Sequence, residues 1–340
     1  MNTHPPALPA EVMAALDRAG LIQPGEVPSG EALAGGVSSD IWRVDLGAGA
    51  VCVKRALPQL RVAALWEAPV SRNAFEVAWI EVAASVNAKA VPRLRGHDVQ
   101  AGLFIMDFLD PARHRLWKTE LREGRADPAQ AAAVGARLVR IHSATAGRPE
   151  IAQRFRTDEI FHAIRLAPYL EATALRHPGA AAALHELVRT TAQTREALVH
   201  GDVSPKNIML GPEGPIFLDA ECAWYGDPAF DLAFVLNHML LKCLWVPAAS
   251  AALAGCFGAL AQSYLQGVDW TGAAVLEARA ARLLPGLLLA RVDGKSPVEY
   301  IVDEAQKNLV RRAALALLAA PVSDLNAVLE RWMIELELPR

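Results

Sequence analysis

Short apolar runs separated by turns characterise the first hundred residues of this chain. The runs are about four residues long and rich in β-branched side chains, and Gly, Ser and Asp fill the turns between them, a pattern typical of strands. One longer stretch instead has the periodicity of a helix. The predicted elements are a helix over 9–19, three strands between 31 and 57, a helix over 71–86 and strands over 95–98 and 102–108. This part is therefore predicted to be a small antiparallel lobe of five strands with an embedded helix.

Helical patterns dominate after the segment from Asp107 to Pro111, which is predicted to be a hinge because proline stops the preceding strand. Helices are expected at 128–144, 158–173, 179–197 and 228–244, with a hairpin at 208–218. The resulting prediction is a two-lobed α+β fold, with a first lobe over 1–107 and a larger, mostly helical lobe over 108–340.

Composition and charge narrow the class of protein. The 340 residues are 53% hydrophobic, and 34 basic against 37 acidic residues leave a charge of -3, which favours neither nucleic acid nor an anionic membrane as partner. The N-terminus lacks the pattern of a signal peptide. The most apolar window, 246–261, falls short of the roughly 20 residues that span a bilayer and is predicted to be a buried helix. The four cysteines lack metal-site spacing and indicate reduced thiols in a cytosolic protein.

The stretch 198–210 carries the strongest chemical signal. Two apolar runs enclose a polar loop with His200, Asp202 and Asn207, and Asp219 follows a second short apolar run. Phosphoryl transfer needs one carboxylate beside the attacking hydroxyl, and an amide oxygen with a second carboxylate as metal ligands. The spacing of Asp202 and Asn207 matches the catalytic loop of protein kinases. The hairpin is expected to return Asp219 to the side of Asn207.

Lys54 interrupts an apolar strand, where an inward ammonium would need a carboxylate partner. The helix over 71–86 offers Glu76 and Glu81, and either would pair with Lys54 as lysine and glutamate do in kinases. Glu76 is the preferred partner because it lies nearer the helix start, with Phe75 and Trp79 available to pack. A lysine on the solvent face is the alternative.

Two further segments of the first lobe are candidates for nucleotide binding. The turn with Gly35, Gly36, Ser38 and Ser39 would let backbone amides approach a phosphate closely, although the turn taken alone favours a simple hairpin. At the hinge, an adenine is expected against backbone groups near Asp107 to Leu109.

Two aspartates beyond the hairpin are predicted to be structural. Asp227 precedes Pro228 and fits a helix N-cap followed by proline at the first helical position. Asp231 lies one turn into an otherwise apolar helix, where a buried carboxylate accepting backbone N–H groups of the catalytic loop is expected. His142 is expected to be a packed histidine.

Taken together, these motifs resemble the aminoglycoside phosphotransferase superfamily, which shares its kinase-like fold with choline, fructosamine and methylthioribose kinases. The resemblance covers about residues 30–240 and is most specific from His200 to Ala233. It implies that Asp202 is the catalytic base, that Asn207 and Asp219 hold Mg²⁺, and that Lys54 binds the α- and β-phosphates of ATP. Residues 33–40 would form the loop that covers the nucleotide.

Departures from the protein-kinase pattern favour a small acceptor. Gly201 and Ala220 stand where protein kinases carry arginine and phenylalanine, and a helix begins about ten residues after Asp219, which leaves no room for an activation segment. Methylthioribose kinases deviate at the asparagine position, whereas this chain keeps Asn207, which disfavours that acceptor.

The acceptor is expected to be bound by helices of the second lobe. His238 and Lys242 share a helix face, four residues apart. Arg291, Asp293 and Lys295 lie in a polar segment, where Ser296 to Glu299 fits a capping box at the start of the next helix. Arg165 and Tyr169 are weaker candidates.

The sequence thus predicts an ATP- and Mg²⁺-dependent phosphotransferase that acts on a hydroxyl of a small molecule such as a sugar, an amino alcohol or an aminoglycoside. A nucleotide-binding pseudokinase is the alternative, disfavoured because Lys54, Asp202, Asn207 and Asp219 are all present. The acceptor's identity, the choice between ATP and GTP, and the oligomeric state do not follow from the sequence.

Overall fold

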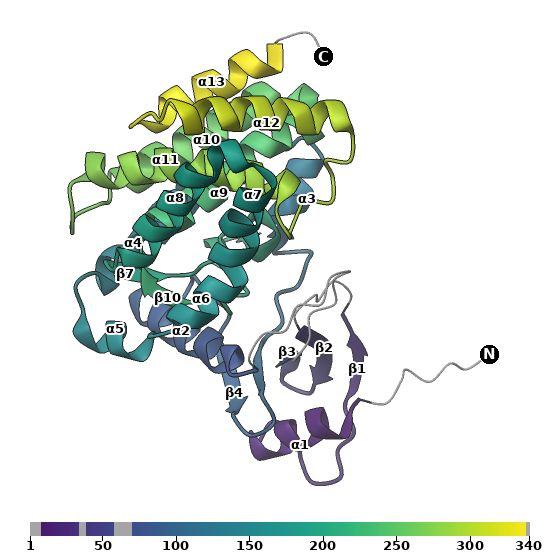
Figure 1. The fold of residues 1–340 in the computed structure, drawn as a ribbon. Coiled ribbons are helices and arrows are strands. Elements are labelled where there is room, and N and C mark those ends of the chain that lie inside the picture. The colour runs from purple at the N-terminus through teal and green to yellow at the C-terminus, as the bar shows by residue number, and fades with distance from the viewer. Residues whose placement is uncertain (1–7, 34–38, 58–69, 338–340) are drawn as a thin grey trace. The chain divides into compact units, whose positions relative to one another are not determined.

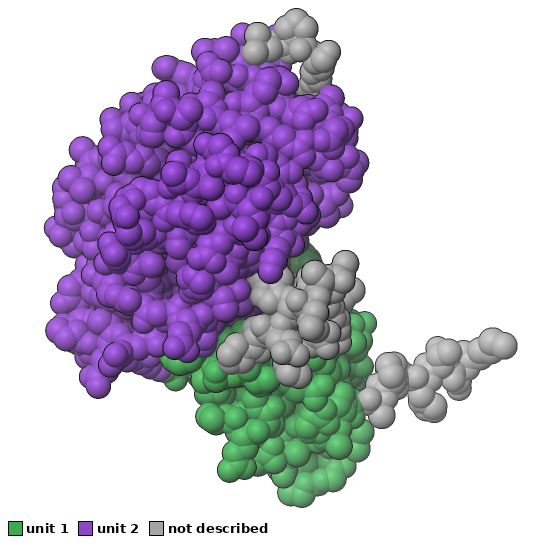
Figure 2. Space-filling view, viewed as in Figure 1, with its two compact units in different colours: residues 1–113 green, residues 114–340 purple. Residues whose placement is uncertain are grey.

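The computed structural model describes residues 8–33, 39–57 and 70–337. The chain divides into two compact units, residues 1–113 and 114–340 (Figure 2), and each is described by itself. The division lies six residues after the predicted end of the first lobe, so the hinge segment belongs to the first unit.

Unit 1 is built on a five-stranded antiparallel sheet in the order β1-β2-β3-β5-β4 (Figure 1). Its elements are α1 (Ala10–Arg18), β1 (Ser29–Ala32), β2 (Ser39–Leu46), β3 (Gly49–Ala56), α2 (Arg72–Val86), β4 (Leu94–Asp98) and β5 (Leu103–Asp107). The predicted five-stranded sheet and the two predicted helices are confirmed. Their apolar residues recur with the period of a strand or of a helix, and this period was enough to identify each element.

Strand alternation divides the two faces of this sheet. Val53 lies opposite Trp42 and Ile105, and these side chains pack with Val12 and Leu16 of α1 in one core. Lys54, the next residue, lies opposite Ile41 and Phe104 and therefore faces the other side. That face carries the contact between β3 and α2.

Unit 2 is mostly helical and contains three short strand pairings (Figure 1). Its helices are α3 (Trp117–Arg122), α4 (Pro128–Thr145), α5 (Pro149–Arg154), α6 (Asp158–Phe161), α7 (Ala172–Arg176), α8 (Ala181–Gln193), α9 (Ala229–Trp245), α10 (Ser250–Leu265), α11 (Ala273–Asp293), α12 (Glu304–Ala319) and α13 (Leu325–Glu337). Its strands are β6 (Arg115–Leu116), β7 (Ala197–Val199), β8 (Ile208–Gly211), β9 (Gly214–Phe217) and β10 (Trp224–Gly226). The predicted α+β kinase-like architecture is confirmed.

The core of unit 2 is centred on α9, which contacts α10 and α11 and is buried along nearly its whole length. Helix α10 packs closely on α4, since a Cβ added to Gly135 would come within 2.5 Å of the Leu260 carbonyl oxygen. Within the described residues, one stretch, 247–265, is long and apolar enough to cross a membrane by length and composition. Phe257 and Leu260 are fully buried in the unit, but only 39% of the most apolar window is buried, so the helix predicted to be buried is only partly so.

The helix expected over 158–173 is confirmed, and its middle part, His162–Glu171, is a π-helix with Pro168 inside it. Two other local predictions were wrong. The helix expected to reach residue 197 ends at Gln193, and Ala197 opens β7. No helix begins at the predicted capping box of Ser296 to Glu299. Helix α12 starts instead at Glu304, and its N-cap is Asp303, whose carboxylate accepts the Gln306 N–H at 3.2 Å.

Candidate active site

The loop between β7 and β8 carries the predicted catalytic residues. β7 pairs with β10, and the segment Pro205–Asn207 forms a single 3-10 turn that leads directly into β8. Both flanking strands are buried, so they fix the two ends of the loop in the core.

Asp202 is held through one carboxylate oxygen, by a hydrogen bond from Asn207 and by ion pairs with Arg165 and Lys206. Its Oδ2 lies 2.9 Å from Asn207 Nδ2, 3.1 Å from Arg165 Nη2 and 3.2 Å from Lys206 Nζ. Among the described residues, none donates to Oδ1. Burial would raise the pKa of Asp202, but the charges of Arg165 and Lys206 outweigh it, so the pKa lies below its usual value. The carboxylate is therefore ionised, with one oxygen anchored and the other free to accept a proton.

Asn207 and Asp219 offer the oxygen ligands that Mg²⁺ prefers. The Asn207 amide nitrogen donates to the carbonyl and carboxylate of Asp202, which leaves the amide oxygen for a cation. The Leu218 N–H donates to the Asn207 carbonyl at 2.9 Å and so brings Asp219 beside the loop. Two protein ligands fit Mg²⁺, which usually takes its remaining oxygens from water and phosphate.

Asp219 has a backbone φ of 66°, which no other described non-glycine residue shares in sign. Such a conformation is uncommon outside glycine and concentrates at functional sites. The turn out of β9 thus holds the second metal-ligand candidate in a strained conformation.

His200 joins the loop to the strand before Asp219. Its Nδ1 accepts the Asp202 N–H at 3.2 Å, and its Nε2 lies 3.1 Å from the Leu218 carbonyl. Burial lowers the pKa of His200. A neutral imidazole that donates from Nε2 satisfies both contacts, so His200 positions the loop.

Asp231 fulfils its predicted structural role. Its carboxylate accepts the His200 and Gly201 N–H groups at 2.7 and 2.8 Å. It also lies 3.2 Å from His142 Nε2, and His142 Nδ1 lies 2.6 Å from the Tyr264 hydroxyl. His142 is thus a packed histidine, as expected, and three helices support the loop through this network.

In unit 1, Lys54 forms an ion pair with Glu76, at 2.8 and 2.7 Å from the two carboxylate oxygens. Both side chains are buried, at 4% and 2% exposure. Glu81 is exposed. The structure therefore pairs Lys54 with Glu76, on the face of the sheet that α2 covers.

The remaining nucleotide candidates are only partly described. Gly35, Gly36 and Ser38 lie outside the described residues. Ser39 is buried at the start of β2. The Asp107 carboxylate pairs with Arg95 and its N–H donates to the Arg93 carbonyl at 2.9 Å, so its side chain serves the sheet. An adenine contact at the hinge would therefore rest on the backbone near Leu109.

The acceptor candidates fall into two groups. His238, Lys242 and Arg291 are all buried. Burial, together with the charges of Arg291 and Lys242, holds the pKa of His238 well below its usual value. Asp293 instead pairs with Arg311 and His177, at 2.7 and 2.8 Å. Lys295 is exposed.

The importance of Arg165 was underestimated from sequence. It lies on the π-helix, donates from Nε to the Gly201 carbonyl and pairs with Asp202. The sequence signal for Arg165 is a charged residue in an apolar helical stretch that contains a proline. The π-helix found there adds weight to this signal, since π-helical segments are frequent at functional sites.

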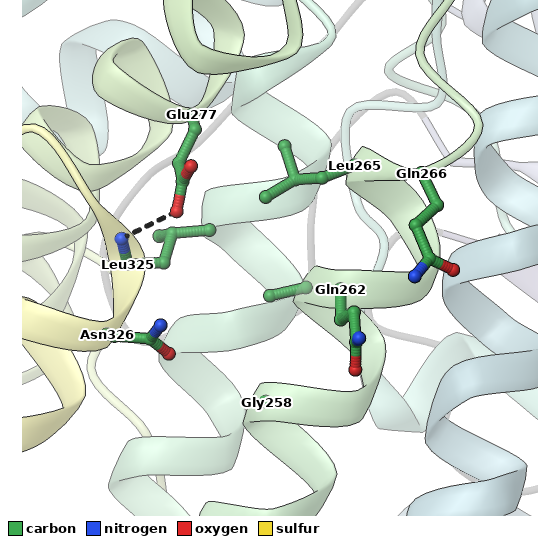
Figure 3. A pocket seen from close by; sticks show the side chains of 8 residues that line it. Gly258, Gln262, Leu265, Gln266, Glu277, Leu325 and Asn326 are labelled. Atoms are coloured by element: carbon green, nitrogen blue, oxygen red, sulfur yellow. Dashed lines mark hydrogen bonds between the residues drawn. The ribbon is translucent and has the colours of Figure 1, made fainter.

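One open cavity of about 640 Å³ lies elsewhere in unit 2, between α10, α11 and the start of α13 (Figure 3). Among its lining residues, Glu277 is the single charged one, and its carboxylate accepts the Leu325 N–H at 3.0 Å. None of the predicted site residues lines this cavity, so it offers no groups for phosphoryl transfer.

Comparison with known proteins agrees with this geometry. Residues 29–276 match the profile of the phosphotransferase enzyme family. The methylthioribose kinase of Pectobacterium carotovorum is 25% identical over 261 residues, which are 67% of this chain and 64% of that protein. The chain therefore spans less than two thirds of the length of this relative.

Solved structures share the fold at lower identity. The choline kinase of Cryptosporidium parvum superposes with a TM-score of 0.57 at 11% identity, covering 95% of this chain and all of that one (100%). The amicoumacin kinase hAmiN, solved with AMP-PNP, Ca²⁺ and Ami, has a TM-score of 0.55 at 16% identity, covering 93% and 96%. With a family profile matched over most of its length and a kinase-like fold, the chain belongs to the phosphotransferase enzyme family.

Proposed function

We propose that this protein transfers the γ-phosphoryl group of ATP to a hydroxyl of a small molecule. The observation that carries the proposal is the state of Asp202, which is ionised, anchored through Oδ2 and without a described donor on Oδ1. A carboxylate of this kind orients a hydroxyl and takes up its proton late in a loose transfer.

In the proposed reaction, the acceptor oxygen forms a bond to the γ-phosphorus while the bond from that phosphorus to the β,γ-bridging oxygen breaks. The hydroxyl proton passes to Asp202 Oδ1, and ADP leaves. Asp202 has a low pKa, so it is a weak base that suits late proton transfer rather than early deprotonation.

The other residues have supporting roles in this proposal. Asn207 and Asp219 would hold Mg²⁺, which neutralises charge on the phosphates. Lys54, oriented by Glu76, would bind the α- and β-phosphates. Ser39, with Gly35, Gly36 and Ser38, would cover them. The complex of the amicoumacin kinase with AMP-PNP and a divalent ion supports a nucleotide and a metal as the ligands.

The acceptor class is proposed from the relatives as a small hydroxyl compound. The names of similar proteins include kinases of methylthioribose, ethanolamine, choline and amicoumacin, which supports a metabolite or an antibiotic rather than a macromolecule. Because all four cysteines are free and buried, we place the protein in a reducing compartment, the cytoplasm.

Thermal shift and turnover together test the proposal. ATP is expected to raise the melting temperature more with Mg²⁺ than without it, and a panel of sugars, sugar acids, amino alcohols and aminoglycosides should contain an acceptor that accelerates ADP release. Asp202→Ala should remove that acceleration and leave the ATP-induced shift nearly intact. A shift without turnover on any acceptor would instead indicate a nucleotide-binding regulator.

A further inference from the structure

Basic and aromatic side chains from four segments of unit 2 gather in one place. We define the basic cluster as Lys118 of α3, His238 and Lys242 of α9, Arg291 of α11 and Tyr300 in the segment before α12. Lys242 is 1% exposed, His238 6% and Arg291 9%. Buried cations are rare unless they are paired, so the cluster requires an explanation.

Lys242 lies on aromatic rings instead of beside a carboxylate. Its Nζ is 4.3 Å from the ring centroid of Trp245 and 4.8 Å from that of Tyr300, and these two rings stack at 4.4 Å. Within the described part of the chain, Lys242 forms no ion pair. Glu299, the acidic neighbour, pairs with Lys118.

Arg291 is likewise bonded only to neutral groups. Its Nη1 lies 3.1 Å from the Tyr169 hydroxyl and 3.0 Å from Ser296 Oγ, and it also donates to the Ser296 carbonyl. Its Nε and the Tyr300 hydroxyl are buried, and no described residue bonds to either. Among the described residues, two buried cations thus form no ion pair of their own, since the nearby Glu299 pairs with Lys118, and two buried polar atoms of the same cluster lack a partner.

The cluster is connected to the catalytic loop through Tyr169. Arg291 bonds to the Tyr169 hydroxyl, and the Arg165 guanidinium lies 5.7 Å from the centroid of the same ring. Arg165 in turn contacts Asp202 at 3.1 Å. A single aromatic residue, Tyr169, therefore lies between Arg291 of the cluster and the pair of Arg165 and Asp202.

The charge of the cluster disfavours a cationic acceptor. Burial, which is the largest effect, and the charges of Lys118 and Arg291 lower the pKa of Lys242 to about 7, against the opposing charge of Glu299. The faces of Trp245 and Tyr300, which would otherwise suit an ammonium group, are already covered by Lys242. An aminoglycoside or choline would meet like charges there.

We propose that the acceptor is a hydroxy compound with an anionic group, a carboxylate or a phosphate monoester, which Lys242, Arg291 and Tyr300 bind while its hydroxyl reaches Asp202. An anion would form the direct ion pairs that Lys242 and Arg291 lack and would accept from Arg291 Nε and the Tyr300 hydroxyl. This inference rests on the proposed phosphotransferase function.

A matched set of probes isolates the charge of the acceptor. The first set consists of anionic D-gluconate, neutral D-glucose and cationic D-glucosamine, which have similar carbon chains. Adding D-glucose 6-phosphate shows whether the site prefers a phosphate to a carboxylate. The second set repeats the comparison of charge on three carbons, with glycerate, glycerol and 2-amino-1,3-propanediol. We expect Asp202-dependent transfer with an acidic member of a set to exceed that with its neutral and cationic partners at least tenfold in kcat/KM.

Lys242→Met tests whether the cluster provides that preference, because it keeps the stem on the rings and removes the charge. It should raise KM for the acidic acceptor at least tenfold, and the acid should raise the melting temperature of the wild-type protein but not of the variant. Lys307→Met, the same change on a half-buried lysine of α12 that pairs with Glu304, should leave both readouts unchanged. The stability of Lys242→Met should equal or exceed that of wild type, which separates the effect from misfolding.

Other outcomes discriminate between the two proposals. Asp202-dependent transfer that prefers neutral or cationic probes, or a KM for the acid that Lys242→Met leaves unchanged, would overturn the anionic acceptor and leave the phosphotransferase function standing. Acid-induced stabilisation that depends on Lys242, without any Asp202-dependent turnover, would support the anion site and overturn the phosphotransferase function.

Discussion

At position 201 the backbone has a φ of 78°, and a Cβ there would lie 2.6 Å from the Cys222 carbonyl oxygen. Both observations restrict this position to glycine. They give a physical reason for the absence of the arginine found in protein kinases, because any side chain would push the catalytic loop away from the segment after Asp219. At the scale of single residues, the position of the catalytic loop therefore depends on the absence of a side chain at Gly201 as well as on the contacts of Asp202 and Asn207.

Replacing Gly201 by alanine is expected to destabilise the protein by about 2 to 5 kcal/mol, from the unfavourable φ and the clash together. Urea denaturation measures the change. Gly258→Ala is the matched control, because that helical glycine has open space around its Cβ position and should gain about 0.5 to 1 kcal/mol. Equal stability of the two variants would contradict the close approach seen at Gly201.

Spacing in the sequence was enough to identify Asp202 and Asn207 as candidates, because their offset matches a phosphoryl-transfer loop. Lys54 was identified because it interrupts an apolar strand. The preference for Glu76 over Glu81 as the partner of Lys54, based on its place near the helix start, is confirmed. Spacing was not enough for Arg165, whose contact with Asp202 spans 37 residues and depends on a π-helical turn. Such a contact is tertiary and leaves little trace in local sequence.

Among the elements, α9 and α4 together determine where the catalytic loop lies. Asp231 of α9 accepts two loop N–H groups, and His142 of α4 contacts the same carboxylate. A charged acceptor for backbone N–H groups is worth more than a neutral one. The apolar helix of the core thus carries one buried carboxylate, and that carboxylate orients the loop that contains Asp202.

Asp231→Asn is expected to cost about 2 to 4 kcal/mol in the free energy of unfolding, because charge-assisted hydrogen bonds become neutral or are lost. A small displacement of Asp202 should lower kcat about a hundredfold while KM for ATP stays nearly constant. Denaturation and steady-state kinetics measure the two effects. Asp269→Asn, the same change at an exposed carboxylate bonded to Ser143, should change neither, and an unaltered kcat in Asp231→Asn would contradict the positioning role.

Local sequence patterns predicted helices and strands correctly where no tertiary contact involved the same groups. They failed where a tertiary contact used the side chain or backbone group on which the prediction depended. Strand alternation in unit 1 predicted the sheet. The capping box at Ser296 failed because Arg291 takes the Ser296 hydroxyl and carbonyl, while Asp303 caps the helix instead. The same buried arginine that disrupted the prediction belongs to the basic cluster.

At the scale of the whole molecule, buried ionisable groups make stability depend on pH. Burial, with the charges of Lys118 and Arg291, lowers the pKa of Lys242 to about 7 against the opposing charge of Glu299. His238 and Tyr300 also lie near the ammonium, but burial lowers the pKa of His238 and raises the pKa of Tyr300, so both lie further from the range between 7 and 8.5 than usual. In that range, the unfolded chain keeps the Lys242 proton and the folded chain releases it.

Since the unfolded state binds more protons in this window, stability is expected to rise with pH, by up to about 1.4 kcal/mol per pH unit. The measurement is the difference in unfolding free energy between wild type and Lys242→Met from pH 7 to 8.5. The window ends there because burial raises the pKa of all four cysteines, so thiol ionisation favours the unfolded chain at higher pH. A difference that does not change with pH would contradict a buried ammonium with a lowered pKa.

The central claim is that Asp202 directs phosphoryl transfer to a small hydroxyl compound. The most direct test is to measure which compound receives the γ-phosphate of ATP. With [γ-³²P]ATP, Mg²⁺ and a pooled fraction of metabolites below 1 kDa, wild type should convert label into a compound other than inorganic phosphate. Asp202→Asn should lower that conversion by about a thousandfold, and Asp17→Asn, an exposed aspartate of α1, should leave it unchanged. Equal transfer by wild type and Asp202→Asn, or ATP binding without any transfer, would contradict the account.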